Sequence, residues 1–178
     1  MRSATDMLVR YAEFHRDPRN IAMHCIGVPI IVFALGMLLS RPGFTLAGFT
    51  LTPAWGAFVL AALWYVTRGS LTLGTTVTLG TSVLVLAAHR VSGASGTAGW
   101  FWLGMGCFVI GWIFQLLGHY YEGRKAVFVT DLVSLLVGPM FVAAQALFAM
   151  GWNPALQQEI IRRAGPTRLR DLAHPMAH

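Results

Sequence analysis

Two groups of polar residues in this otherwise apolar chain have side chains that can bind a metal ion. The first group is Tyr11, His15, Asn20 and His24, near the N-terminus, and the second is Gln115, His119 and Glu122. Imidazole is a good ligand for iron, zinc, copper and nickel. Both groups lie at the ends of segments apolar enough to cross a bilayer, where polar side chains are costly and rarely incidental. The residue types therefore predict a metal site at a membrane surface.

The N-terminal group is divided between two predicted helices. Residues 3–15 can form an amphipathic helix that His15 closes. Asp17 followed by Pro18 is typical of an N-cap with proline at the first helical position, so we expect a second helix to begin there. His24 then lies about one turn into that second helix.

Helical spacing gives each group a single face. Asn20 and His24 are four residues apart and therefore share a face of the second predicted helix. Gln115, His119 and Glu122 are spaced by four and then three residues, which places all of them on one stripe of a later helix. Each group therefore presents its polar side chains in one direction.

The composition indicates an all-α integral membrane protein. Of 178 residues, 56% are hydrophobic and only 11% are charged, whereas soluble domains carry roughly 25% charged residues. The net charge of +6 does not indicate a nucleic-acid partner, because the basic residues are scattered and form no basic face with interleaved aromatics. We expect one membrane domain over residues 1–178, with an interfacial helix and turn in 1–19, membrane helices in 20–151 and a surface helix and tail in 152–178.

Five charge-free runs approach the length that crosses a hydrocarbon core of about 30 Å. They are residues 21–40, part of 42–67, 69–88, 100–118 and 132–151. We expect four transmembrane helices, of which the second is short and begins at Pro53. In the fifth run, Gly138 and Pro139 favour a re-entrant hairpin, because proline frees a backbone carbonyl and bends a helix. A straight fifth apolar helix remains open.

The number of predicted spans brings the two histidine groups to one membrane face. Four crossings return the chain, after residue 118, to the side from which residue 21 started. Seven lysines and arginines lie on that side before the fifth run, against Arg41 and Arg90 on the other. The positive-inside rule predicts that the side with seven basic residues is the cytoplasmic side. We expect a bacterial inner membrane, or the endoplasmic reticulum if the source is eukaryotic, with the site facing the cytoplasm.

One iron ion held by imidazoles is the preferred interpretation of the two groups. Glu122 is the main acidic residue near the histidines, with Glu13 and Asp17 as weaker candidates, so carboxylates are too few for a standard di-iron site. Three or four imidazoles leave coordination positions open for substrate and oxygen. Glu122 itself could ligate iron, orient a histidine or move a proton.

Other polar residues are candidates for supporting roles. Glu122 and Tyr11 are the candidate catalytic residues. Tyr11, Asn20 and Gln115 could also contact substrate or orient a ligand, because a ligating histidine usually passes its second N–H to an acceptor. Arg124 and Lys125 could hold an anionic carboxylate headgroup, although cytoplasmic basic residues at this place also follow from topology alone.

Two blocks of this sequence resemble a known family. They are YAEFHRDPRNIAMHCIGVP at residues 11–29 and GWIFQLLGHYYEGRKAVFVTDLVSLLVGP at residues 111–139, and they are similar to the fungal and bacterial membrane family of Fe(II)-dependent 2-hydroxy fatty acid dioxygenases. The resemblance implies α-oxidation, in which a long-chain 2-hydroxy fatty acid and O2 give the acid one carbon shorter. It implies Fe(II) as cofactor, His15, His24 and His119 as its ligands, and roles for Asn20, Gln115, Gly118 and Glu122. Ala126 departs from the family, which usually has proline there.

Several alternatives stay open from the sequence. A haem-binding membrane electron carrier would use paired axial histidines. A small proton-coupled transporter would use polar residues within the membrane as a relay, although no inverted repeat is evident. His89 ends the third run on the opposite predicted face, which favours an interfacial role over iron ligation. The oligomeric state is not predicted.

Overall fold

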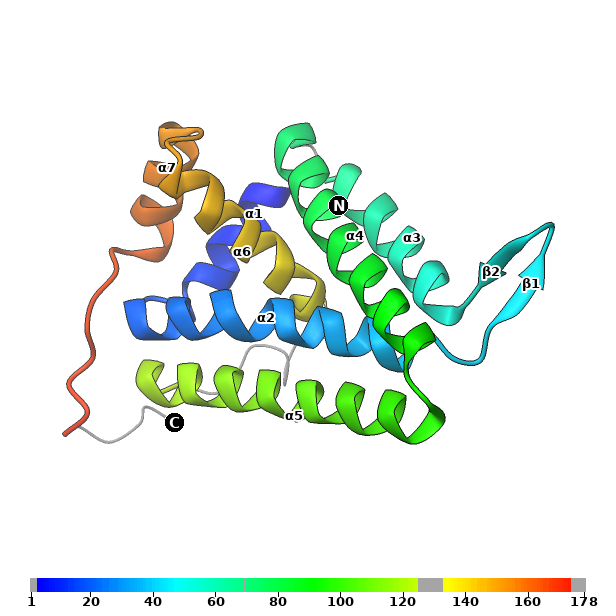
Figure 1. Cartoon of the computed structure of the whole chain (residues 1–178). Coiled ribbons are helices and arrows are strands. Elements are labelled where there is room, and N and C mark those ends of the chain that lie inside the picture. The colour runs from blue at the N-terminus through cyan, green and yellow to red at the C-terminus, as the bar shows by residue number, and fades with distance from the viewer. Residues whose placement is uncertain (1–2, 69, 125–132, 174–178) are drawn as a thin grey trace.

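The computed structural model describes residues 3–68, 70–124 and 133–173. In that part of the chain it contains seven helices and one two-stranded hairpin (Figure 1). The elements in order are α1 (Ala4–Ala12), α2 (Pro18–Leu38), β1 (Phe44–Leu46), β2 (Phe49–Leu51), α3 (Pro53–Val66), α4 (Leu71–Ala94), α5 (Thr97–Glu122), α6 (Ser134–Ala149) and α7 (Pro154–Ala164). The predicted all-helical class is therefore confirmed apart from the small hairpin.

Three of the described helices, α2, α4 and α5, are long and apolar enough to cross a membrane. They are consistent with a membrane protein. The second predicted span is α3, which has 14 residues and at 1.5 Å per residue is only about 21 Å long. The four predicted spans are therefore not confirmed.

The threonine-rich segment of α4 is helical in spite of its β-branched residues. The hydroxyl of Thr76 donates to the carbonyl of Thr72 at 2.8 Å, and that of Thr81 donates to the carbonyl of Val77 at 2.8 Å. These bonds satisfy the hydroxyl donors within the helix itself. The helix continues to Ala94 without a break.

The re-entrant hairpin predicted at Gly138 and Pro139 is wrong, because α6 is a single helix from Ser134 to Ala149. Pro139 lies in the second turn, so its missing N–H interrupts the hydrogen-bond ladder only near the start of the helix. Tertiary packing supports the rest: Phe141 and Ala144 are buried in the core that α6 shares with α1.

The junction between α1 and α2 places His15 in a connection and not at a helix end. The helix α1 ends at Ala12, earlier than predicted, and residues 13–17 link it to α2. Asp17 is the N-cap of α2 and accepts a hydrogen bond from the backbone N–H of Arg19, with Pro18 at the first helical position as predicted. The interfacial, amphipathic placement of α1 is not confirmed: it buries residues such as Leu8 against the rest of the protein.

Glycines allow α2 and α5 to run side by side in opposite directions (Figure 1). Gly104, Gly111 and Gly118 recur every seven residues on α5 and are buried. A Cβ atom at Gly111 would lie 3.1 Å from the carbonyl oxygen of Gly27, and one at Gly118 would lie 3.0 Å from Nδ1 of His24. The two backbones can approach this closely only because these positions lack side chains. The approach brings the end of α5 to the beginning of α2.

A hairpin that the sequence reading missed connects α2 to α3. Its strands are antiparallel, with Phe44 paired to Leu51 and Leu46 to Phe49. Ala47 and Gly48 form the turn and both have positive φ, 50° and 82°. The signal was present in the sequence, since a two-residue segment ending in glycine between two copies of Phe-Thr-Leu is typical of a hairpin. In Figure 1 the hairpin projects at the end of α2 away from α1 and α7.

Candidate metal centre

Three histidines from separate elements meet in the interior. His15 comes from the connection after α1, His24 from the second turn of α2 and His119 from the last turn of α5. All are buried, and one ring nitrogen of each lies within 4.8 Å of the corresponding nitrogens of the others. Among the described residues these histidines are the group able to share one metal ion. The predicted meeting of the two polar groups is thus what the structure shows.

Backbone carbonyls define the tautomers of two of these rings. Nδ1 of His15 lies 2.7 Å from the carbonyl oxygen of Tyr11, and Nδ1 of His24 lies 3.0 Å from the carbonyl oxygen of Asn20. A carbonyl oxygen can only accept a hydrogen bond, so Nδ1 must carry the hydrogen in both rings. In the neutral rings Nε2 therefore has an unprotonated lone pair. The two Nε2 atoms face each other at 3.1 Å.

This arrangement fits a metal ion. Two nitrogen ligands that bind one ion at about 2.0–2.1 Å and at right angles are roughly 3.0 Å apart. A cation between the rings would replace repulsion of lone pairs by coordination, and donation from Nδ1 to a carbonyl is the usual way in which a ligating histidine is oriented. Nδ1 of His119 is buried without a hydrogen-bond partner among the described residues. The donor set of three imidazoles suits iron, zinc, copper or nickel.

Burial keeps His15 and Tyr11, which lie outside the long apolar helices, in the protonation states that a metal site needs. Burial, with the nearby His24 acting in the same direction, holds the pKa of His15 well below its ordinary value, so the ring is neutral at pH 7. Tyr11 stacks on His15 with ring centroids 3.9 Å apart. Burial raises the pKa of Tyr11 above its ordinary value, so its hydroxyl retains the proton and can donate a hydrogen bond.

Glu122 lies beside the site and holds the connection that bears His15. Its Oε2 accepts hydrogen bonds from the backbone N–H groups of Arg16 and Asp17, each at 2.9 Å, and from the side-chain amide of Asn20 at 3.0 Å. It is not a member of the histidine group. Of the roles considered from the sequence, this geometry favours orientation of a histidine. Asn20, which is fully buried, joins this support through a second bond to the carbonyl of Phe14.

An apolar cavity of about 290 Å³ opens from the histidines between α2, α5 and α6. Gln115 and Tyr11 line its polar end, as the sequence suggested for groups near substrate. Nε2 of Gln115 is buried and has no hydrogen-bond partner in the described part of the chain. The remaining lining is formed by Val28, Ile31, Val32, Leu35, Phe108, Trp112, Ser134, Leu135, Gly138 and Pro139. The cavity thus combines imidazole nitrogens that could hold a metal ion, one buried amide donor and a long apolar wall.

The other candidates lie elsewhere. His89 packs against Trp55 on α3, with ring centroids 5.8 Å apart, and is not part of the histidine group. The guanidinium of Arg124 donates to the carbonyl of Glu13 at 3.1 Å and lines a different cavity from the histidines. The structure therefore does not bring Arg124 to the histidine cavity. Lys125 lies outside the described residues.

Sequence reasoning missed most of the cavity wall. Part of it follows from helical spacing, because Val28, Ile31 and Leu35 continue the face of α2 that begins with His24. Phe108 extends the face of His119 along α5 in the same way. The wall from α6 had no such signal, since it depends on how a separate helix packs against the other two.

Known proteins match most of the length of this chain. A family model described as "2-hydroxy-palmitic acid dioxygenase Mpo1-like" matches residues 1–150. The chain is 33% identical over 153 residues to the protein named 2-hydroxy-palmitic acid dioxygenase MPO1 of Saccharomyces cerevisiae, an alignment that covers 83% of this chain and 81% of the yeast protein. No solved structure matches the chain significantly.

Proposed function

Because this chain belongs to the Mpo1-like family of 2-hydroxy-palmitic acid dioxygenases, we propose that it is an Fe(II)-dependent dioxygenase of long-chain 2-hydroxy fatty acids. Its product is the fatty acid one carbon shorter. The observation that supports this most directly is the group of buried histidines, with bare nitrogens 3.1 Å apart, at one end of an apolar cavity. The cavity provides a place for the acyl tail beside the metal ligands.

His15, His24 and His119 would hold the iron. Bound there, Fe(II) supplies Lewis-acid chemistry and the activation of O2 next to the C1–C2 bond of the substrate. The protein supplies orientation: the carbonyl oxygens of Tyr11 and Asn20 keep Nδ1 of His15 and His24 protonated, so that Nε2 of each ring would be free to bind the metal. Glu122 keeps the His15 connection in place from outside the cavity.

The polar end of the cavity has donors for the substrate headgroup. The buried amide of Gln115 lies one helical turn before His119, on the same face of α5. We assign it to a hydrogen bond with an oxygen of the 2-hydroxy acid, because a buried donor without a partner is costly. The hydroxyl of Tyr11 is the second donor available in the cavity lining.

The apolar wall follows the length of the two central helices. From His24 to Leu35 along α2, and from His119 back to Phe108 along α5, the lining extends by about 17 Å at 1.5 Å per residue. An extended acyl chain lies naturally along such a wall and excludes water from the reacting carbon atoms. The excess of lysines and arginines on the predicted side of the membrane that bears the histidines supports a cytoplasmic site.

A haem protein is a weaker alternative. The rings of the three histidines have centroid distances of 4.3, 5.1 and 5.1 Å. Two axial nitrogens on opposite sides of a haem iron would be about 4 Å apart, from two bonds of about 2.0 Å, and a porphyrin would have to fit between the rings. The 3.1 Å contact between His15 and His24 leaves no space for one. A proton-coupled transporter is also less favoured, because the grouped polar side chains lie at one end of the long helices.

The decisive experiment is metal analysis of the full chain purified without oxygen, followed by incubation with 2-hydroxypalmitic acid and O2. We expect bound iron, no Soret band, and a product one carbon shorter. His24→Ala and His119→Ala should lose both the iron and the activity. His89→Ala is the matched control, because this histidine lies outside the group, and it should retain both. Normal iron content and full activity in the first two variants would refute the proposal.

A further inference from the structure

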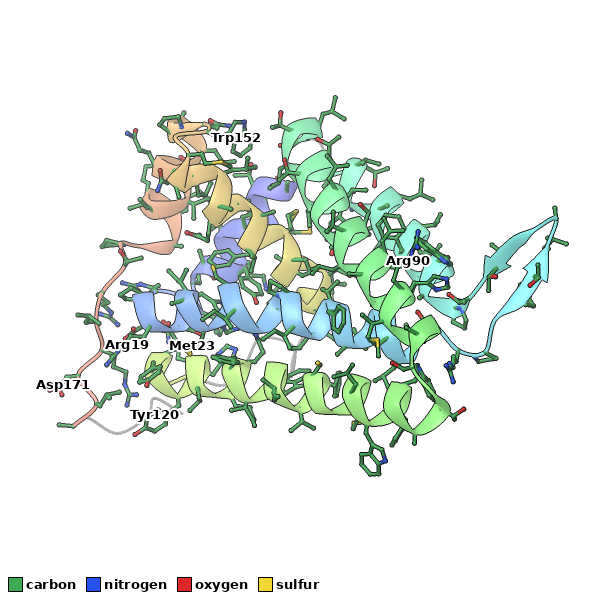
Figure 2. The ribbon with its side chains drawn as sticks, in the orientation of Figure 1. Arg19, Met23, Arg90, Tyr120, Trp152 and Asp171 are labelled. Atoms are coloured by element: carbon green, nitrogen blue, oxygen red, sulfur yellow. The ribbon has the colours of Figure 1, made fainter. Side chains whose placement is uncertain are left out.

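A second cavity, lined mainly by charged residues, lies at the same end of the molecule as the histidines. Glu122, which holds the connection that bears His15, is part of its lining. The cavity has a volume of about 370 Å³ and we call it the arginine pocket. Its lining comes from the start of α2, the end of α5 and the C-terminal segment, and consists of Arg16, Asp17, Glu122, Arg124, Arg168, Leu169, Arg170 and Asp171. Figure 2 shows Arg19, Tyr120 and Asp171 gathered at this end, where α2 begins and α5 ends. None of the pocket's residues lines the histidine cavity.

Two of the carboxylates in the arginine pocket are already engaged. Glu122 accepts two backbone N–H groups and the amide of Asn20. Asp17 accepts from the guanidinium of Arg19 at 2.7 Å and from the backbone N–H of Arg170 at 2.9 Å. Burial by itself would raise the pKa of Asp17. The hydrogen bonds, first of all the one from the side chain of Arg19, outweigh burial and lower this pKa to about 2. These two carboxylates thus have donors of their own, and the third one in the lining, that of Asp171, accepts the backbone N–H of Ala173 at 2.9 Å.

The arginines, in contrast, have guanidinium donors left over. Among the described residues, Arg16, Arg124 and Arg168 form no ion pair. Arg16 donates from Nε to the carbonyl of Pro166, and Arg124 donates from Nη1 to the carbonyl of Glu13. A guanidinium has five N–H donors, and its planar fork matches phosphate. Three such groups line this one cavity, which is the arrangement that binding of an anion needs.

The surroundings indicate where the anion comes from. Residues 166–172 cross the ends of two helices long enough to span a membrane, held there by the bond from the N–H of Arg168 to the carbonyl of Arg16 at 3.0 Å. Within this segment the side chains of Leu169 and Leu172 are 69% and 42% exposed. Leu169 lies between Arg168 and Arg170, and Leu172 follows Asp171. Exposed leucines next to arginines at the end of long apolar helices match a lipid interface, where the apolar side chains enter the acyl boundary and the cations meet the headgroups.

We propose that the arginine pocket binds the phosphate of an anionic phospholipid headgroup. Arg16, Arg124 and Arg168 hold the phosphate, and Leu169 and Leu172 contact the upper part of the acyl chains. The site is distinct from the fatty acid cavity and does not depend on the proposed reaction. The binding is reversible and forms no covalent bond.

The test uses the full chain in a neutral detergent and measures retained lipid by native mass spectrometry. Phosphatidylglycerol and phosphatidylcholine with identical acyl chains are offered separately. We expect at least about tenfold preference for phosphatidylglycerol in the natural chain, and loss of this preference in the double variant Arg124→Gln with Arg168→Gln. The matched control is Arg90→Gln with Arg162→Gln, which removes the same charge outside the pocket and should keep the preference.

A second variant and a competition arm make the outcome unambiguous. The double variant Leu169→Asn with Leu172→Asn leaves the arginines in place. It should weaken the binding of phosphatidylglycerol and leave the binding of inorganic phosphate unchanged. If inorganic phosphate at equal concentration displaces the lipid completely, the pocket binds free phosphate and the lipid assignment is wrong. Equal lipid preference in the pocket variant and the control variant would overturn the site itself. Far-UV circular dichroism of each variant confirms that it is folded.

Discussion

Replacement of Gly118 by alanine should damage the proposed metal site without replacing any of its three histidines. A Cβ at this position would collide with Oδ1 of Asn20 and would lie 3.0 Å from Nδ1 and 3.2 Å from Cε1 of the His24 ring. Neither neighbour can retreat freely. Asn20 is bonded to Glu122 and Phe14, and the His24 ring is fixed through Nδ1 to the carbonyl of Asn20.

The magnitude follows from this geometry. Insertion of one carbon atom into a packed helix interface costs about 1–3 kcal/mol. Local separation of α2 and α5 is opposed by the close packing of Gly111 against Gly27, seven residues earlier on α5. The strain must therefore turn the His24 ring or lengthen its bond to Asn20. Loss of such an orienting bond typically weakens metal affinity 10- to 100-fold.

The assay is a competition titration of iron(II) against a chelator of known affinity, combined with denaturation of the same preparations. Gly106→Ala is the matched control, because it lies on the same helix and a Cβ there would meet nothing within 4 Å. We expect Gly118→Ala to bind iron 10- to 100-fold more weakly than Gly106→Ala. If the two variants bind iron equally, the close approach of α2 and α5 does not define the metal site, and the reasoning fails.

Three further predictions address the support, the wall and the cap of the site. Glu122→Ala leaves two backbone N–H groups unpaired and should cost about 1–3 kcal/mol in the free energy of unfolding, together with a loss of iron binding. Glu122→Gln retains an acceptor and should restore part of the iron binding, which it could not do if Glu122 were a carboxylate ligand. Phe108→Ala enlarges the far end of the cavity and should shift substrate preference toward longer acyl chains, as measured with a series of 2-hydroxy acids. Asp17 has a pKa of about 2 in the folded chain against an ordinary 3.8, so its stabilising effect is present above about pH 4 and disappears as the pH falls through about 2. Acid denaturation should show this component in the natural chain and lack it in Asp17→Asn; identical acid profiles would contradict the assignment.

The meeting of the histidines could be predicted from the sequence because it depends on the order of long apolar helices. His24 and His119 each stand on a long helix whose apolar length is visible in the chain, so the ends that must meet could be inferred from the order of the helices. Asp17 and Pro18 specified the start of α2 by local chemistry alone. Such features depend on residues close in sequence, and a pattern can therefore reveal them.

Features that depend on distant partners could not be inferred in this way. The bonds of Glu122 go to backbone groups at Arg16 and Asp17, and a backbone N–H leaves no trace in the sequence. Gly138 and Pro139 suggested a break, but burial of Phe141 and Ala144 in the tertiary core stabilises α6 as one helix. Local preference was overruled there by packing.

The two unprotonated nitrogens that face each other at 3.1 Å also bear on how much of this protein a cell maintains. A cation that removes their repulsion binds the folded chain and not the unfolded one, so its binding energy adds to folding stability. At a free metal concentration one hundred times the dissociation constant the gain is about 2.7 kcal/mol. Changes of about 1–2 kcal/mol alter the amount that escapes proteolysis several-fold. The proposed metal site therefore predicts that the abundance of the protein follows the supply of the metal, with no dedicated sensor required.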